Sequence, residues 1–259
     1  MPELKDQIIY NRGMNLILIP ILSGWLAGWL VNYLADVLPV TRRFSRPTCP
    51  HCQTAYPWGG YLFFHACTVC GTPRKWRALA VQAVLAVAAI LLWVFPRPHF
   101  PFVLSFLLVI FLSLVFVIDV ENRLILHPVS IFGAFLGLGI GIYLHGVVTT
   151  LIGSAVGFGV MLIFYFVGEL YVRFMSKKRG MSTDEVALGF GDVNLSGVMG
   201  LLLGWPRIME GLLFAVLAGG LISLFIILGM LIAKKYRAFT AIPYAPFLIL
   251  GTLYILYIL

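Results

Sequence analysis

Residues 102–118 read FVLSFLLVIFLSLVFVI, a continuous stretch without a single charge, and the residue that follows is Asp119. A helix that crosses the hydrocarbon core of a bilayer needs about 20 predominantly apolar residues, with a range of about 17–25. The stretch is therefore long enough to span a membrane, and it ends on an acidic side chain. Its continuous apolar character disfavours a β-barrel strand, in which apolar and polar residues alternate.

The composition of the whole chain supports the same interpretation. Hydrophobic residues make up 61% of the 259 residues and charged residues 11%, and the mean hydropathy is +1.00. A soluble domain carries about 25% charged residues because its surface must be solvated. Most of this surface must face lipid. The net charge of +8 is typical of cytoplasmic loops rich in Lys and Arg, so we expect a lipid bilayer, and no nucleic acid, as a partner.

We predict an all-α polytopic membrane protein with about eight transmembrane helices. The predicted spans are residues 14–38, 79–95, 102–118, 129–144, 147–171, 193–204, 212–233 and 242–259. The sixth is short, and we expect it to begin earlier, near Val186. Residues 1–13 mix acids and bases, which is unlike a cleavable signal peptide, and residues 173–185 are expected to form a polar loop.

The distribution of basic residues predicts the orientation. If the segment after the first helix is cytoplasmic, most of the 18 Lys and Arg residues fall in cytoplasmic loops, as the positive-inside rule requires. The chain then divides into a first helix with its N-terminal segment (1–38), a cytoplasmic insertion (39–78) and a membrane domain (79–259). We expect a multi-pass protein of the cell inner (cytoplasmic) membrane.

All four cysteines lie in the insertion, in the sequences Cys49-Pro-His-Cys52 and Cys67-Thr-Val-Cys70. A C-x₂-C knuckle reverses the chain so tightly that both of its sulfurs can bind one ion, so the four thiolates suit tetrahedral Zn²⁺. Four sulfurs leave no open position for water, which makes a structural role the expectation. Two disulfides or a redox C-x-x-C motif are the alternatives. A cytoplasmic location disfavours stable disulfides, and no βαβ pattern supports a redox domain.

Two acidic residues are the candidates for catalysis. Asp119 ends the third predicted helix, and Asp192 opens the sixth in the sequence Gly189-Phe190-Gly191-Asp192. The predicted topology places both at the cytoplasmic ends of helices, where an ionisable group within the membrane is a functional candidate. Two facing carboxylates can share a proton: the ionised one takes a proton from water while the protonated one polarises a scissile carbonyl. From spacing alone, helix capping or pairing with Arg123 is an equal alternative.

Five segments resemble, in this order, those of the type IV prepilin peptidases, which are GxGD-type membrane aspartyl proteases. The first two are the first-helix G-x-x-x-N…LP signature (Gly28 to Asn32, with Leu38-Pro39) and the two C-x₂-C pairs. The next two are Asp119 with the Leu124-Ile125-Leu126-His127-Pro128 turn, and the G-x-G-D block at Gly189–Asp192. The last is Ile242-Pro243-Tyr244-Ala245-Pro246-Phe247, which is similar to I-P-[FY]-[GA]-P-[FY]. Glycine lets a backbone or a substrate approach closely. The resemblance implies catalysis by Asp119 and Asp192, with Gly189, Gly191, Pro243 and Pro246 supporting the site.

The resemblance also implies an activity. Members of the family remove a short basic leader from type IV prepilin or pseudopilin precursors at the cytoplasmic face. Many then N-methylate the new terminus with S-adenosylmethionine. Three departures from the family pattern concern Val129 (usually Asp), Asn194 (usually Lys) and the segment 56–61 between the knuckles. In the family, the positions of segment 56–61 are associated with methyl transfer. The same holds for the position of Gln82, where the family often has Glu.

Two other classes of function are compatible with parts of the sequence. A catalytically silent membrane scaffold whose zinc module docks a partner would retain the knuckles and tolerate the departures, but it leaves two acids at matched depth unexplained. A proton-coupled transporter also uses intramembrane acids, although its acids lie near the midplane rather than at one face. The sequence does not predict the oligomeric state.

Overall fold

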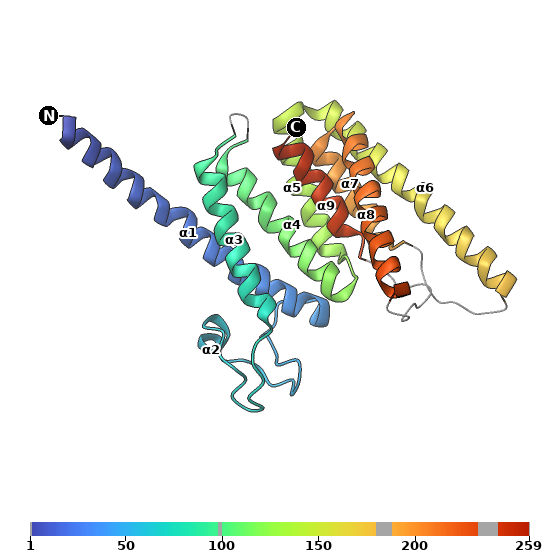
Figure 1. Ribbon diagram of the computed structural model, residues 1–259, viewed down its shortest axis with the longest axis horizontal. Coiled ribbons are helices and arrows are strands. Elements are labelled where there is room, and N and C mark those ends of the chain that lie inside the picture. Colours follow the sequence, from blue (N-terminus) through green and yellow to red (C-terminus); the bar gives the residue numbers. More distant parts are fainter. Residues whose placement is uncertain (1, 98–99, 180–187, 233–242, 259) are drawn as a thin grey trace. The chain divides into compact units, whose positions relative to one another are not determined.

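The computed structural model describes residues 2–97, 100–179, 188–232 and 243–258, and within these ranges the chain is helical apart from irregular loops, turns and two isolated β-bridges. The helices are α1 (Pro2–Thr41), α2 (Trp58–Leu62), α3 (Trp76–Val94), α4 (Phe102–Asn122), α5 (His127–His145), α6 (Val147–Arg179), α7 (Phe190–Leu203), α8 (Arg207–Ile232) and α9 (Ala245–Tyr257) (Figure 1). The predicted all-α fold class is confirmed.

Six segments are long and apolar enough to cross a membrane, and they confirm a multi-pass protein. They are Ile17–Thr41, Trp76–Val94, Phe102–Asn122, His127–His145, Val147–Phe174 and Arg207–Ile232. The other two predicted spans correspond to α7 and α9, which have 14 and 13 residues. At 1.5 Å per residue each is only about 20 Å long, shorter than a hydrocarbon core of about 30 Å. The count of eight predicted spans is therefore approximate.

Two predicted boundaries are wrong. The sixth helix begins earlier than Val193, as expected, but it starts at Phe190 and not near Val186, because Leu188 forms a bend and Gly189 is extended (φ −71°, ψ 139°) immediately before α7. Val186 itself lies outside the described residues. The loop predicted from Arg173 is instead helical as far as Arg179. Lys and Arg are good helix formers, so charge ends the apolar span there without ending the helix.

The chain forms two compact units, Met1–Leu114 and Val115–Leu259, and the boundary between them falls within α4. In the first unit, α1 packs along α3 (Figure 1). The buried Asn32 side-chain amide donates a hydrogen bond to the main-chain oxygen of Ala78 (2.9 Å), and the Gln82 amide donates to the main-chain oxygen of Trp25. Each helix thus hydrogen-bonds the backbone of the other. The predicted domain limits at residues 38 and 78 stay a prediction.

In the second unit, α7 packs against α5, α6, α8 and α9 and is buried almost from end to end (Figure 1). Its closest neighbour is α6, because a Cβ atom on Gly200 would overlap the main-chain oxygen of Gly153, and one on Gly153 would overlap that of Gly200. The buried hydroxyl of Ser196 donates to the main-chain oxygen of Gly157 (2.9 Å) and fastens the same contact. This packing fixes the N-terminal turn of α7, which carries Asp192.

Candidate active site and metal centre

Asp119 lies in the last turn of α4 and is only 5% exposed. The helix ends just beyond it, where Arg123 adopts a left-handed conformation (φ 51°) and its N–H donates to the main-chain oxygen of Asp119 (2.7 Å). The negative end of a helix dipole disfavours an anion. A carboxylate buried at this position therefore needs compensation from another part of the structure.

That compensation comes from the start of α9. The main-chain N–H of Ala245, the first residue of α9, donates a hydrogen bond to the Asp119 carboxylate, and the positive charge of Arg123 acts on it as well. The first N–H groups of a helix have no partner within the helix and attract anions. Pro246 occupies the second position of α9, where its missing N–H costs nothing. The N-terminus of α9 therefore holds one candidate acid.

Asp192 is the third residue of α7 and is 8% exposed. The N–H of Gly189 donates a hydrogen bond to its carboxylate. A Cβ atom on Gly191 would lie 2.7 Å from Cβ of Ile125, which is closer than such atoms can approach. The absence of a side chain at Gly191 thus lets the first turn of α7 contact the segment between α4 and α5, which follows the last turn of α4 that carries Asp119.

Asp119 and Asp192 are both buried, and they interact electrostatically within the second unit. One oxygen of each carboxylate, Oδ2 of Asp119 and Oδ1 of Asp192, is buried without a hydrogen-bond partner. Buried polar atoms are nearly always satisfied, and two like charges at close range cannot both ionise at low cost. The arrangement can hold one shared proton and bind a water molecule or a polar substrate group.

Substituting Gly191 tests this packing. Gly191→Ala places a methyl group against Ile125, so the turn carrying Asp192 must move, and a displacement of about 1 Å in an active site can cost about 100-fold in rate. We therefore expect any activity that depends on Asp192 to fall about 100-fold while the protein still inserts into membranes. Gly220→Ala in α8 is the matched control, because nothing lies within 4 Å of its Cβ position. Equal activity of the two variants would contradict the inferred close contact.

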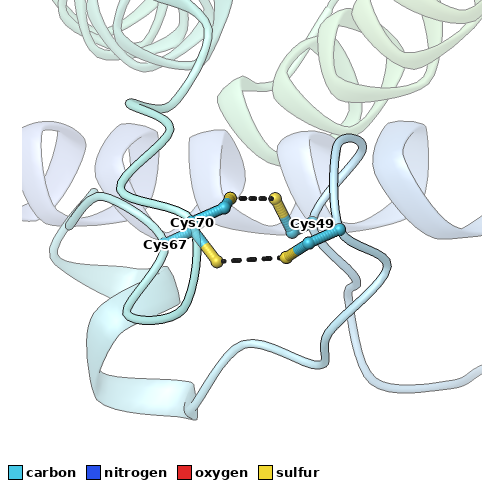
Figure 2. A group of neighbouring side chains, drawn as sticks. Cys49, Cys67 and Cys70 are labelled. Carbon is cyan, nitrogen blue, oxygen red and sulfur yellow. Dashed lines mark hydrogen bonds between the residues drawn. The ribbon is translucent and has the colours of Figure 1, made fainter.

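The four cysteines form a second cluster, in the first unit. The Sγ atoms of Cys49 and Cys70 are 3.6 Å apart and those of Cys52 and Cys67 are 3.5 Å apart, and all four sulfurs lie within 4.8 Å of one another. These separations exclude a disulfide, whose S–S bond is about 2.05 Å. They agree with the spacing of about 3.8 Å that Zn–S bonds of about 2.3 Å give in a tetrahedron. Figure 2 shows Cys67 and Cys70 on one loop facing Cys49 on the other.

Both knuckles have the same backbone geometry. In the first, the N–H of Gln53 donates to the oxygen of Cys49 (2.9 Å), and in the second the N–H of Gly71 donates to that of Cys67 (2.9 Å). Gln53 (φ 58°) and Gly71 (φ 68°) are both left-handed, a conformation that costs little only for glycine. Hydrogen bonds from the N–H groups of Cys52 and His51 lower the pKa of the Cys49 thiol to about 6, which favours the thiolate that binds metals.

Asp36, near the end of α1, ties the knuckles to the membrane helices. It accepts hydrogen bonds from the Tyr61 hydroxyl (2.6 Å) and from Arg74 (3.0 Å), and it pairs with Arg77. The Arg74 guanidinium also lies over the Tyr61 ring, 3.9 Å from its centroid. Burial and the charge of Asp36 raise the pKa of Tyr61, so its hydroxyl stays a donor. Asp36 is therefore an ion-pair partner of two arginines of the insertion.

The structure places several residues that the sequence singles out near one another. Asp119 and Asp192 interact electrostatically, Gly189 and Gly191 lie next to Asp192 in the chain, Pro246 follows Ala245 at the start of α9, and Pro243 lies two residues before α9. Sequence reasoning missed the main-chain N–H of Ala245 and the contact of Gly191 with Ile125. The proline-flanked stretch that contains Ala245 was the available signal for the first of these. No sequence signal identified Ile125 as the neighbour of Gly191, because that contact depends on how α7 packs.

The fold and the acid pair define a polytopic helical membrane protein with two buried carboxylates placed together, and comparison with known proteins narrows this class. Residues 106–224 match the model of the type IV leader peptidase family. The matched segment includes both Asp119 and Asp192.

Two curated relatives are similar to the chain, and both are named prepilin leader peptidase/N-methyltransferase. The protein from Aeromonas hydrophila is 23% identical over 220 residues, covering 82% of this chain and 71% of the relative. The protein from Pectobacterium carotovorum subsp. carotovorum is 28% identical over 187 residues, covering 68% of this chain and 63% of the relative. No solved structure gives a significant match.

These matches support one enzyme class. Residues 106–224 are similar to the type IV leader peptidase family, and this match and the names of the two relatives support a peptidase. The resemblance seen in the sequence is thereby confirmed.

Proposed function

We propose that the chain is an aspartic endopeptidase that removes the leader of type IV prepilin-like precursors at the cytoplasmic face of the inner membrane. Asp119 and Asp192 are its catalytic residues in this proposal. The precursor's own apolar helix lies in the bilayer beside the enzyme. Its basic leader stays on the cytoplasmic side of the membrane, as the positive-inside rule requires. The family match and the names of the two relatives support this choice of substrate.

The chemistry follows from a shared proton. The ionised carboxylate takes a proton from water as the water oxygen bonds to the scissile carbonyl carbon, and the protonated carboxyl group gives its proton to the carbonyl oxygen. The tetrahedral diol then collapses: the C–N bond breaks, the leaving nitrogen takes a proton from one aspartate, and a diol proton returns to the other. One water molecule is consumed, and the acid pair regains its initial state.

The observation that carries the proposal is the pair of buried carboxylate oxygens without partners, Oδ2 of Asp119 and Oδ1 of Asp192. An unsatisfied buried acceptor costs about 1–3 kcal/mol, and more when it is charged. Helix capping engages one carboxylate oxygen and gives no reason for the second oxygen of each acid to be buried. A catalytically silent scaffold gives no reason to retain two of them at one site.

Co-expression with prepilin-like candidates from the same genome tests the proposal. Mass spectrometry of each candidate is expected to show the loss of a leader-length segment only when the enzyme is present. If no candidate is shortened by the correctly inserted protein, the proposed function is contradicted. Substrate flux in reconstituted vesicles would instead favour the transporter.

We propose Zn²⁺ as the ion of the four-cysteine cluster. The sulfur spacing, the paired knuckle turns and the lowered pKa of Cys49 all fit four thiolate ligands. The buried core of the insertion consists of only Cys49, Tyr56, Tyr61 and Cys67. So small a core cannot stabilise a fold by itself, and a structural metal commonly takes that role. When bound, the ion supplies a cross-link between the two knuckles.

N-methylation of the new amino terminus is a second candidate activity. It is supported by the names of both relatives, and S-adenosylmethionine is the methyl donor that the family resemblance implies. We assign no residue of this chain to the donor. Mass spectrometry of the mature substrate from the native host decides the question: an added methyl group supports a transferase, and a free amine indicates a peptidase alone.

A further inference from the structure

The middle of the cysteine-containing insertion carries no formal charge. Between Arg46 and Arg74 the sequence has no Asp, Glu, Lys or Arg, although a water-exposed domain carries about 25% charged residues. Within this stretch, residues 58–64 read WGGYLFF and include α2. The side chains of Trp58 and Phe63 are 49% and 64% exposed. An uncharged segment with exposed aromatic rings is unlike a surface that faces water on all sides.

An ion pair marks where the first two membrane spans end. Residues 13–35 of α1 carry no charge and measure about 35 Å as a helix, enough to cross a hydrocarbon core of about 30 Å. Asp36 is the next residue. In α3, Arg77 directly precedes another uncharged stretch, residues 78–96. Because Asp36 pairs with Arg77, the charged ends of the two spans lie at one level, which we take as the edge of the hydrocarbon core.

The helix α2 packs on the apolar part of α1, on the membrane side of Asp36. The indole N–H of Trp29, which precedes Asp36 by about 10 Å along the helix axis, donates a hydrogen bond to the main-chain oxygen of Leu62 (3.1 Å). The rings of Tyr33 and Trp58 have centroids 5.9 Å apart. Both of these α1 residues belong to a candidate membrane span. The insertion therefore returns to the level at which α1 meets lipid.

The backbone of this segment suits an environment that is poor in water. The main-chain oxygens of Gly59, Gly60 and Tyr61 accept hydrogen bonds from main-chain N–H groups later in the segment (2.9–3.4 Å), and that of Leu62 accepts the bond from Trp29. Main-chain groups without partners are costly where water is absent. A carbonyl in free contact with water would not need a tryptophan of a membrane span as its donor.

We propose that residues 58–64 are a membrane-interface anchor, with Trp58 and Phe63 inserted between the headgroups and upper acyl chains of the bilayer beside α1. Aromatic side chains are enriched at membrane–water interfaces, and interfacial segments bury their apolar side about 5–10 Å into the boundary region. This depth agrees with the position of Trp29 relative to Asp36. The partner of the exposed rings is thus lipid of the leaflet at which α1 ends.

The charges beside the segment suit an anionic lipid surface. Arg42, Arg43 and Arg46 follow the end of α1 and are exposed, and basic clusters next to a membrane helix are attracted to anionic headgroups. Tyr61 of α2 shares the buried core of the insertion with Cys49 and Cys67, so the anchor also holds the cysteine cluster at the membrane surface. The inference does not rest on the proposed peptidase function.

Photo-cross-linking in the full-length protein tests the anchor. The protein is reconstituted in vesicles of phosphatidylcholine and phosphatidylglycerol, with p-benzoylphenylalanine in place of Phe63. Illumination is expected to add the mass of one phospholipid to the peptide that contains position 63. The same replacement at His51, an exposed residue of the first knuckle, is expected to add none. Equal lipid adducts at both positions, no adduct at position 63, or cross-links there to protein instead of lipid would contradict the anchor.

A charge at the same position gives a second test. Phe63→Asp places a carboxylate in the boundary region, so the segment should leave the membrane more often. We expect chymotrypsin, which cuts after aromatic residues, to cleave it at least about fivefold faster, because proteolysis follows the population of the open form. Phe63→Leu should match the wild type, and both variants should keep their zinc content.

Two results of this second test would overturn the inference. A wild-type cleavage rate in Phe63→Asp would show that position 63 already faces water. Loss of zinc in the same variant would show that Phe63 stabilises the knuckles and does not act as an anchor. Neither experiment uses peptidase activity, so the anchor and the proposed function can fail separately.

Discussion

Asp119→Asn and Asp192→Asn are each expected to abolish leader removal, with a loss of at least about 1000-fold in rate. An amide has nearly the shape of a carboxyl group, but it can neither take a proton from water nor give one to a carbonyl, and such transfers contribute about 10²–10⁴-fold each. Both variants should still insert into the membrane and bind metal. The measurement is the rate of precursor shortening, followed by mass spectrometry.

A control and a double variant sharpen this prediction. Glu169→Gln removes a carboxylate from a membrane helix without touching the site, because Glu169 pairs with Arg173 one turn along α6 (2.5 Å), and it should keep the wild-type rate. The double variant at Asp119 and Asp192 should be no slower than either single one, since groups that act as a unit show strongly non-additive losses. A single variant that keeps a tenth of the activity would contradict the paired role.

The second large effect concerns the metal. The purified protein is expected to contain about one Zn²⁺ per chain, and Cys49→Ser combined with Cys67→Ser should reduce this below about 0.1, because one ligand is lost from each knuckle. Metal binding and folding are coupled in small metal-stabilised modules. The insertion should therefore become sensitive to protease in the variant. Elemental analysis and limited proteolysis measure the two effects.

His51→Ala is the matched control for the metal. Its side chain is exposed and is not part of the cluster of possible ligands, whereas its main-chain N–H, which hydrogen-bonds Cys49, is retained. The metal content of this variant should equal that of the wild type. A metal-free wild type, or a cysteine variant that keeps its metal, would contradict the assignment of the four thiolates.

The sequence predicts those features that local pattern determines. Hydropathy predicted the positions of the apolar helices. The C-x₂-C spacing predicted the cluster of four sulfurs, because each knuckle is a local turn. Asp119 and Asp192 could be placed at one end of the bundle by counting membrane crossings. Helix ends were less accurate. α6 continues past Phe174 on good helix formers that hydropathy excludes, and α7 begins before Val193, as expected, but only at Phe190 because Gly189 is extended.

Contacts between distant segments could not be predicted. Asp36 pairs with Arg74 and Arg77 across the insertion rather than with a basic residue next to it in the chain. The N–H of Ala245 reaches Asp119 only because α9 packs against α7. The sequence indicated that this proline-flanked stretch supports the site, but a main-chain donor has no residue type of its own, so no side-chain pattern could reveal its role.

The central claim is that Asp119 and Asp192 meet at one site, and cross-linking measures this most directly. With cysteine at both positions, a short bifunctional thiol reagent should give an intramolecular link that peptide mapping identifies. A pair at positions 119 and 204 should give none, because Gly204 lies at the opposite end of α7, about 20 Å away. Absence of the 119–192 link, with the two positions labelled from opposite faces of the membrane, would contradict the account.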